Sequence, residues 1–295
     1  METSRFISTL EEKKVLVSDG ATGTNLIQRG LPKGMPAENW VLENPEEITR
    51  LHQDFIKAGA DIILTCTFGG SKIRLEQSNL SGQFKEINTK AAKLARKAAE
   101  DAGVLVAGSM GPLGHMLKPL GLLEESEAEK NYRDQAAILS DAGVDILLIE
   151  TQFDLVEATA AVQGARNASD LPIICSFSFD RGTKTMMGVS PTKFAEALEG
   201  SGISMIGINC GKGLEENYAC LQELSSATSL PIWFKPNAGL PIINQSGETE
   251  YSIFPEEMAE NVHLWLKAGA EIIGGCCGTS PDHLRQISKA VKKHR

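Results

Sequence analysis

Three of the six cysteines stand where thiolate ligands for a metal could gather. Cys276 and Cys277 are adjacent and follow an apolar run that ends in two glycines, and Cys210 ends a second apolar run. Zinc takes thiolate ligands at about 2.3 Å, and a catalytic zinc site leaves its fourth position open. An adjacent cysteine pair also suits redox chemistry, so the spacing alone leaves both kinds of site open. We expect the other three cysteines to be small buried apolar side chains, namely Cys66, Cys175 and Cys220.

Carboxylates follow two further apolar runs. Asp19 begins a turn, residues 19–24, in which two glycines and hydroxyl groups could bind an amine or a phosphate. Glu150 directly follows residues 146–149, and a carboxylate in such a place must be paired or hydrogen-bonded. Either the ammonium group of a substrate or a buried lysine such as Lys235 could supply that partner. Asn209, beside Cys210, can both accept and donate hydrogen bonds, as amino-acid recognition requires.

The elements that must position these residues repeat along the chain. Several segments consist of a glycine, a small polar step and a β-branched apolar run, as in residues 59–64 and 143–148. The glycine is typical of a helix C-terminus, and a continuously apolar run is typical of a strand buried on both faces of a parallel sheet. The pattern predicts eight strands, at about 15–19, 61–67, 104–109, 145–150, 172–178, 205–209, 231–236 and 271–275.

Amphipathic stretches between these runs predict eight helices. Three of them begin with a polar residue before a proline, which favours a helix N-terminus, at Asn44, Ser190 and Ser280. Strands alternating with helices predict a (β/α)8 TIM barrel, a single α/β domain that spans residues 1–295. An open doubly wound sheet is the alternative, but the chain has no G-x-G-x-x-G turn. The helices are expected at about 46–58, 85–102, 128–142, 155–168, 191–200, 214–228, 256–268 and 281–293.

A barrel brings the candidate residues to one end. Barrel active sites form at the carboxyl ends of the strands. Strands six and eight flank strand seven, so we expect Cys210 to lie near the adjacent cysteine pair despite a separation of 66 residues. Long connections follow strands one, three and seven, and we expect them to surround the same face, at residues 24–45, 110–127 and 237–255.

Composition narrows the class of protein. The chain has 295 residues, 38 Asp and Glu against 29 Lys and Arg, and a formal charge of -9. This charge argues against binding to nucleic acid or to an anionic membrane surface. No apolar run approaches the roughly 20 residues that span a bilayer, and the first residues lack the pattern of a signal peptide. We therefore expect a cytoplasmic protein, and its charge is compatible with a small-molecule substrate.

Together these motifs resemble the homocysteine S-methyltransferase family, and within it the homocysteine-binding N-terminal module of cobalamin-dependent methionine synthase. The resemblance extends over essentially the whole chain. The pairing of an Asn-Cys strand end with a Gly-Gly-Cys-Cys-Gly-Thr segment is its most specific part. The matching segments are residues 19–24, 59–69, 108–112, 150–151, 207–210, 236–239 and 274–279.

The resemblance implies a zinc-dependent enzyme that moves a methyl group to the thiol of L-homocysteine and forms methionine. It implies that one zinc ion per chain is held by the catalytic cysteines Cys210, Cys276 and Cys277. It also implies that the substrate's amino-acid end lies among Asp19, the Gly20 and Ala21 backbone, Glu150 and Asn209.

The methyl donor is the least specified part of this expectation. Because the sequence ends shortly after the eighth expected helix, we expect a donor that is separate from this chain. Methylcobalamin, free or on a separate corrinoid protein, is the first expectation, and S-methylmethionine or a betaine is the alternative. The chain has only three Trp and three Tyr, which disfavours a betaine donor.

Two interpretations of other kinds make different predictions. A non-enzymatic zinc-binding regulatory barrel predicts a mouth without a site for a substrate amine, and the carboxylates Asp19 and Glu150 argue against it. A thiol-dependent aldolase or oxidoreductase barrel that uses Cys276 and Cys277 predicts redox sensitivity without a metal.

Overall fold

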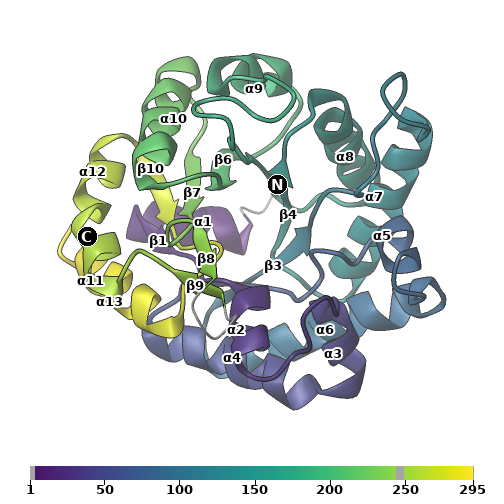
Figure 1. Cartoon of the computed structure of the whole chain (residues 1–295), viewed down its shortest axis with the longest axis horizontal. Coiled ribbons are helices and arrows are strands. Elements are labelled where there is room, and N and C mark those ends of the chain that lie inside the picture. The colour runs from purple at the N-terminus through teal and green to yellow at the C-terminus, as the bar shows by residue number, and fades with distance from the viewer. Residues whose placement is uncertain (1–3, 244–248, 295) are drawn as a thin grey trace.

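The apolar runs form one ring of eight parallel strands, with helices packed around its outside (Figure 1). The computed structural model describes residues 4–243 and 249–294. The strand order is β1-β10-β7-β6-β5-β4-β3-β2, and an isolated parallel bridge between Ser18 and Ile62 joins the two ends of the sheet. The predicted (β/α)8 barrel is therefore confirmed. Its strands are β1 (Leu16–Val17), β2 (Ile62–Leu64), β3 (Leu105–Met110), β4 (Ile146–Gln152), β5 (Ile173–Phe177), β6 (Met205–Cys210), β7 (Ile232–Pro236) and β10 (Ala270–Ile273).

Apolar side chains from all eight strands fill the inside of the barrel. One cluster contains Leu16, Ile62, Leu105, Ile146, Ile174, Met205, Trp233 and Ile272, all of them buried. Helix α1 (Arg5–Lys13), which the sequence pattern does not predict, adds Phe6 and Leu10 to the same cluster. The Ser4 hydroxyl caps this helix by accepting a hydrogen bond from the backbone N–H of Ile7. Packed apolar side chains thus close the N-terminal end of the barrel.

The outer helices follow the predicted order. The predicted helix at 256–268 is two helices that meet at Asn261. The hydroxyls of Ser190 and Ser280 cap their helices as expected, whereas the side chain of Asn44 makes no capping hydrogen bond. The outer helices are α4 (Pro45–Ala58), α6 (Phe84–Ala99), α7 (Glu125–Asp141), α8 (Leu155–Ala168), α9 (Pro191–Leu198), α10 (Leu214–Ala227), α11 (Pro255–Glu260), α12 (Val262–Lys267) and α13 (Pro281–Lys292).

Short helices occupy the connections after the first two strands. Residues 24–45, expected as a long connection, contain most of α2 (Thr22–Gln28) and all of α3 (Ala37–Glu43). Helix α5 (Lys72–Glu76) and the 3-10 turn η1 (Ser81–Gln83) precede α6, and the turn η2 (Glu100–Ala102) follows it. Helices of five to seven residues span too few turns to show a helical period in the sequence. Helices α2, α3 and α5 follow strand ends and therefore lie on the C-terminal side of the barrel, where the functional site is found.

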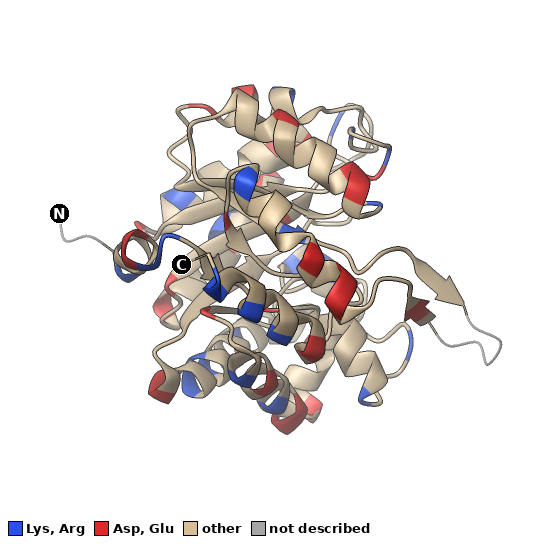
Figure 2. Cartoon of the chain, turned by 90° about the vertical axis from the view of Figure 1, so that its left-hand side faces the viewer, with Lys and Arg blue, Asp and Glu red and all other residues tan. Residues whose placement is uncertain are grey.

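The connection after β7 contains an antiparallel hairpin. Its strands are β8 (Pro241–Ile243) and β9 (Thr249–Tyr251). Figure 2 shows the hairpin projecting from the barrel on the side away from the N-terminus and α1. Residues 244–248 of the predicted connection 237–255 lie outside the described residues. In the described part of the chain, no helix combines the length and the apolar character needed to cross a membrane.

Candidate active site

Three cysteines meet at the C-terminal end of the barrel. Cys210 is the last residue of β6, whereas Cys276 and Cys277 follow β10 on the other side of β7. The Sγ atom of Cys210 lies 2.9 Å from that of Cys276 and 3.8 Å from that of Cys277. All three sulfur atoms lie within 4.8 Å of one another. The fold therefore brings together the three thiols that the sequence places on strands six and eight.

Asparagine side chains hold the backbone around these cysteines. The Nδ2 atom of Asn217 donates to the carbonyl of Cys210 at 2.8 Å. Asn237 links two segments, because its Nδ2 donates to the carbonyl of Gly211 at 2.8 Å and its Oδ1 accepts from the N–H of Cys277 at 2.9 Å. Cys210 itself has a φ of 59°, in the left-handed region that residues with a Cβ rarely adopt. These hydrogen bonds support a strained backbone of the kind that is frequent at functional sites.

The three sulfur atoms fit a zinc ion chemically. In a tetrahedral site with bonds of about 2.3 Å, two sulfur ligands lie about 3.8 Å apart. The separation between Cys210 and Cys277 equals this value at 3.8 Å, while that between Cys210 and Cys276 is shorter, at 2.9 Å. Hydrogen bonds from the other two thiols lower the pKa of Cys277. Hydrogen bonds to the other two sulfurs, with burial, raise the pKa of Cys210. Thiols held this close are a donor set that a thiophilic divalent cation stabilises.

Glu150 lies near the end of β4, and its side chain lines the same cavity as the cysteines. Its Oε1 atom accepts a hydrogen bond from the hydroxyl of Ser109 on β3. Burial raises the pKa of Glu150 to about 7, against the opposing influence of the Lys235 charge. The expected alternative, an ion pair with Lys235, does not form, because within the described residues this lysine pairs with Asp19. The carboxylate of Glu150 is therefore available to a cation in the cavity.

Asp19 already has protein partners for both carboxylate oxygens. Its Oδ1 lies 2.7 Å from Nζ of Lys235, and its Oδ2 accepts from the N–H of Leu64 at 2.7 Å. Burial lowers the pKa of Lys235, but the charges of Asp19 and Glu150 outweigh this effect and raise it. Lys235 lines the cavity, and Asp19 lies behind it. Asp19 thus positions the lysine, and its direct contact with a substrate stays a prediction.

Asn209 connects neighbouring strands behind the cysteines. Its Oδ1 accepts from the N–H of Thr151 at 2.8 Å and from the Ser176 hydroxyl at 2.6 Å. Its Nδ2 donates to the Thr151 hydroxyl at 2.7 Å and to the sulfur of Cys276 at 3.7 Å. The Asn209 amide thus accepts two hydrogen bonds and donates two. Its contacts with Thr151 hold that residue at a φ of 62°. Asn209 positions a cysteine and a strand end, and its contact with a substrate also stays a prediction.

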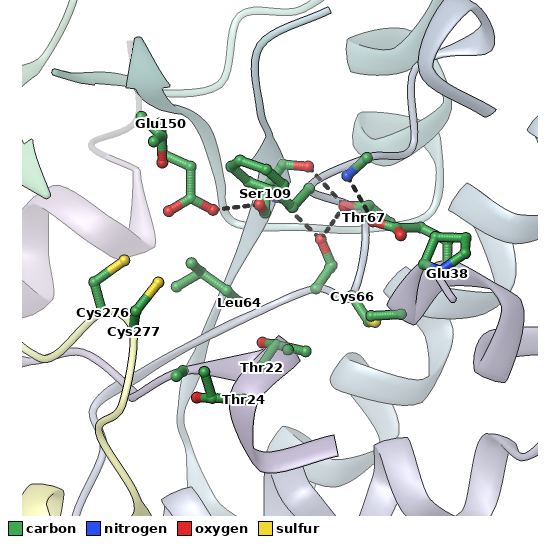
Figure 3. Close-up of a pocket in the computed structure, with 18 of the residues that line it drawn as sticks. Thr22, Thr24, Glu38, Leu64, Cys66, Thr67, Ser109, Glu150, Cys276 and Cys277 are labelled. Atoms are coloured by element: carbon green, nitrogen blue, oxygen red, sulfur yellow. Dashed lines mark hydrogen bonds between the residues drawn. The ribbon is translucent and has the colours of Figure 1, made fainter. Parts of the chain in front are cut away.

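A cavity of about 670 Å³ extends from the cysteines across the barrel mouth. Figure 3 shows Cys276 and Cys277 on one side of it, Glu38 on the opposite side, and Ser109 and Glu150 near the strand ends that lie between. The cysteine end of the cavity therefore contains both the sulfur cluster and a carboxylate.

Gly20 and Ala21 also line the cavity. A Cβ atom at Gly20 would lie 2.7 Å from Cε1 of Phe55 and 2.8 Å from the carbonyl of Thr279, so only glycine fits. The N–H of Ala21 donates to the Thr279 carbonyl at 3.1 Å. This contact joins the end of strand one to the segment after the cysteine pair, and it keeps the turn against the cavity wall.

The opposite end of the cavity consists of residues that sequence reasoning missed. They lie on the short helices and turns after β1 and β2, and they are Met35, Glu38, Phe68, Arg74, Gln77 and Ser78. Met35 and Glu38 lie in the long connection 24–45 and Phe68 in the matching segment 59–69, whereas no predicted feature marks Arg74, Gln77 and Ser78. The remaining cysteines are buried as expected, and burial raises the pKa of each thiol: Cys66, Cys175 and Cys220.

Comparisons with known proteins identify the family of the chain. The family model described as homocysteine S-methyltransferase matches residues 16–291. The chain belongs to the homocysteine S-methyltransferase family. It is 32% identical to methionine synthase from Mycobacterium tuberculosis over 95% of its own length, and also 32% identical to the methionine synthase of Mycobacterium leprae. The chain spans about a quarter of the length of these relatives.

Solved structures of this family include a relative of similar length. The metallated form of the homocysteine methyltransferase MmuM from Escherichia coli superposes with a TM-score of 0.82 at 28% identity. The match covers 96% of this chain and 98% of that one. The apo form of the same protein superposes with a TM-score of 0.75. The fold of the family is thus shared over the whole described barrel.

Proposed function

We propose that the protein transfers a methyl group to the thiol of L-homocysteine, forming methionine, at a zinc ion bound by Cys210, Cys276 and Cys277. The observation that carries this proposal is the convergence of three sulfur atoms at one end of a cavity that also holds Glu150. Membership of the homocysteine S-methyltransferase family supports the reaction, and the name of the metallated relative supports a metal.

The cysteine end of the cavity would activate the substrate thiol. A free thiol has a pKa of about 8.5, so little of it is the nucleophilic thiolate at neutral pH. Zinc held by Cys210, Cys276 and Cys277 would supply the Lewis acidity that keeps an incoming thiol deprotonated. Asn209 and Asn237 hold the cysteine segments in place through the contacts described above. The protein's part is to fix the sulfur in line with the methyl carbon and its leaving group.

The carboxylate and the lysine would bind the amino-acid end of homocysteine. Glu150, oriented by Ser109, accepts the substrate ammonium group in a charge-assisted hydrogen bond. Lys235, held by Asp19, offers a cation to the substrate carboxylate. The backbone of Gly20 and Ala21 forms the adjacent wall. The ammonium and carboxylate groups of homocysteine would thus each meet a side chain of opposite charge close to the three cysteines.

For the methyl donor we propose methylcobalamin, carried by a separate corrinoid protein. The support is that the exposed large apolar side chains of the described residues all follow strand ends, on connections or in the first turn of a helix, where a partner covering the cavity would bury them. We call this set the apolar rim. It consists of Ile27, Phe68, Leu120, Leu122, Val156, Met186, Leu240, Ile242, Ile243 and Phe254. A partner seated on the rim would cover the cavity that contains the thiol cluster.

A small methylated cation such as S-methylmethionine is the second candidate donor. The observation that favours it is the opposite end of the cavity, where Glu38 and Phe68 offer a carboxylate and an aromatic ring. A betaine would use the same groups.

The test supplies zinc-loaded protein with homocysteine and each donor in turn, and measures methionine. The donors are free methylcobalamin, a methylated corrinoid protein, S-methylmethionine and glycine betaine. We expect methionine only when zinc and homocysteine are both present. Bound zinc without methionine from any donor would favour the regulatory barrel. Full activity after chelation of the metal would contradict the proposal and favour thiol chemistry without a metal.

A further inference from the structure

The cavity is larger than homocysteine requires. Its volume is about 670 Å³, whereas an amino acid of eight non-hydrogen atoms fills roughly 150 Å³, compared with roughly 30 Å³ for one water molecule. The surplus space extends away from the cysteines toward Glu38 (Figure 3). We call this part the distal lobe. We assign to it Glu38 and the other cavity residues of the same short elements, namely Met35, Phe68, Arg74, Gln77 and Ser78.

Arg74 in the distal lobe has an unusual environment. It lies on α5 and is partly buried, yet its guanidinium group forms no ion pair and no hydrogen bond with any described residue. Two other arginines of similar burial, Arg29 and Arg96, with side chains 21% and 29% exposed, both pair with carboxylates. A partly desolvated cation without a partner is costly, and a bound anion would remove that cost.

The surroundings hold the guanidinium group at the cavity wall. The Ser71 hydroxyl caps α5 by accepting from the N–H of Arg74 at 3.2 Å. A side chain at Gly114 would collide with Nη1 of Arg74, so this glycine, at a φ of +77°, leaves room for the group. Gln77 lies beside it and is itself held at 3.2 Å by Nε2 of His115. The position of Arg74 is therefore set by its helix and by the connection after β3.

Two carboxylates lie in the same region, and the charge of Arg74 opposes the rise in pKa that burial causes in both, although neither is within ion-pair distance of the guanidinium group. Glu157 is occupied, because it accepts from the N–H of Leu113 at 2.7 Å and from the Tyr132 hydroxyl at 2.8 Å. Glu38 is only 5% exposed and accepts from the N–H of Gly69 at 2.5 Å. The distal lobe therefore presents an unpaired guanidinium group and a buried carboxylate, a combination that matches a ligand with one negative and one positive group.

We propose that Arg74, with the amide of Gln77 and the hydroxyl of Ser78, forms a subsite for the carboxylate of a small methyl donor. This proposal rests on the proposed methyl transfer and deepens its second donor. Glu38 then faces the positive methylated centre, a sulfonium or quaternary ammonium group. In the transfer, the bond between the methyl carbon and the homocysteine sulfur forms while the bond from that carbon to the donor heteroatom breaks. The electron pair of the broken bond stays on the heteroatom, which leaves uncharged.

The experiment compares Arg74→Gln with the wild-type zinc-loaded protein. Calorimetry measures binding of S-methyl-L-methionine and glycine betaine, and of trimethylsulfonium and tetramethylammonium, which lack the carboxylate. We expect Arg74→Gln to weaken binding of the carboxylate-bearing probes by about 10- to 100-fold. Binding of the other two cations, zinc content and homocysteine affinity should stay unchanged. Arg181→Gln, at an exposed position of the connection after β5, is the matched control and should change nothing.

Several outcomes would overturn the subsite. These are unchanged binding in Arg74→Gln, an equal loss for probes without a carboxylate, a loss of homocysteine affinity, or no binding of either carboxylate-bearing probe to the wild-type protein. If Arg74→Gln does not fold, Arg74→Lys keeps the charge but loses the bidentate fork, and an intermediate weakening is expected. Binding that depends on Arg74 without methionine formation would leave the subsite standing and contradict the proposed function.

Discussion

The two ends of the barrel are made by the same eight strands and carry opposite kinds of side chains. At the N-terminal end, Phe6 and Leu10 of α1 pack on the apolar residues that begin the strands. At the C-terminal end, the strand ends and the residues that follow them include the buried groups Asp19, Glu150 and Lys235, together with the thiol cluster. The apolar rim also lies entirely on this side. The N-terminal end therefore contributes apolar packing to the stability of the fold. The C-terminal end carries the groups of the candidate active site and the exposed apolar rim.

The C-terminal end also contains groups that lower the free energy of unfolding. Left-handed φ values at Thr151 and Cys210 cost of order 1–3 kcal/mol each. The pair of Asp19 and Lys235 is desolvated, and such pairs contribute little net stability compared with apolar packing. At the N-terminal end, Lys14 beside α1 also has a left-handed φ, of 63°, but the ion pairs there, such as Lys13 with Asp61, are more exposed than the pair of Asp19 and Lys235. We therefore expect substitutions at the N-terminal end to change mainly the free energy of unfolding, and substitutions at the C-terminal end to change mainly zinc and substrate binding.

The largest effect is expected for Cys210→Ala. Two remaining thiols hold zinc poorly, so the bound metal should be lost, and methionine formation should fall by at least about 10³-fold. The circular dichroism spectrum should change little, because the barrel core is independent of the metal. Metal analysis of the purified variant checks the prediction. Cys220→Ala removes a buried thiol from α10 and should keep its zinc. Full zinc content in Cys210→Ala would remove this residue from the ligand set.

At the opposite end, Phe6→Ala should reduce stability and leave the chemistry intact. Phe6 is 1% exposed, and removing a buried phenyl ring costs about 3–5 kcal/mol. Urea unfolding should show this loss, while zinc content and homocysteine affinity of the folded protein stay at wild-type values. Phe254→Ala, at a position that is 69% exposed on the rim, should change stability by less than about 0.5 kcal/mol. Loss of zinc in folded Phe6→Ala would show that the two ends are coupled.

Glu150→Gln should weaken homocysteine binding and stabilise the protein at high pH. Burial raises the pKa of Glu150 from 4.5 to about 7, so the folded state binds this proton more tightly than the unfolded chain. The resulting stability is present below pH 4.5 and is lost as the pH rises through about 7. The variant should therefore exceed the wild-type free energy of unfolding by up to about 3 kcal/mol at pH 8.5, and match it near pH 4.5.

The same variant should bind homocysteine about 10- to 100-fold more weakly at pH 8, because it lacks the charge that meets the ammonium group. Wild-type affinity should itself decline as the pH falls below about 7, where Glu150 becomes protonated. Glu196→Gln, at an exposed position of α9, is the control for both measurements and should behave as wild type. Equal homocysteine affinity in Glu150→Gln would assign this carboxylate to the fold alone.

The sequence predicts which cysteines meet at the barrel mouth, but it does not predict which carboxylate pairs with Lys235. Continuous apolar runs mark all eight strands, and the barrel topology then requires Cys210 to approach Cys276. The sequence offers Lys235 two acidic partners, and the choice between them depends on which side chains of β1, β4 and β7 face one another. In the structure it pairs with Asp19, 216 residues away. Such a preference is decided by tertiary packing and leaves no local pattern.

Short elements explain most of the remaining differences. Helices α1, α2, α3 and α5 have five to nine residues, so local periodicity separates them poorly from loops. They nevertheless carry Glu38 and Arg74 in the distal lobe and Phe6 in the closed end. The sequence thus fails to indicate residues on short helices, because tertiary contacts with the rest of the barrel, and not a local pattern, determine where these helices lie.

The smallest effect is expected on the apolar rim. Leu122 is 91% exposed, so a charge there should barely alter stability, zinc content or homocysteine affinity. A corrinoid protein that docks on the rim would have to desolvate that charge. Leu122→Asp should therefore slow methyl transfer from a methylated corrinoid protein by about 3- to 10-fold, corresponding to about 1 kcal/mol. Transfer from S-methylmethionine should be unchanged, because a small molecule does not cover the rim.

A matched charge at the other end completes this test. Ser8→Asp adds the same charge on α1, at the closed end, and should affect neither donor. If Leu122→Asp slows both donors equally, the substitution acts on the cavity and the rim is not a docking surface. If it slows neither, while the corrinoid protein remains an active donor, the partner approaches along another part of the mouth. The β8–β9 hairpin, with Ile242 and Ile243 exposed, is then the next surface to alter.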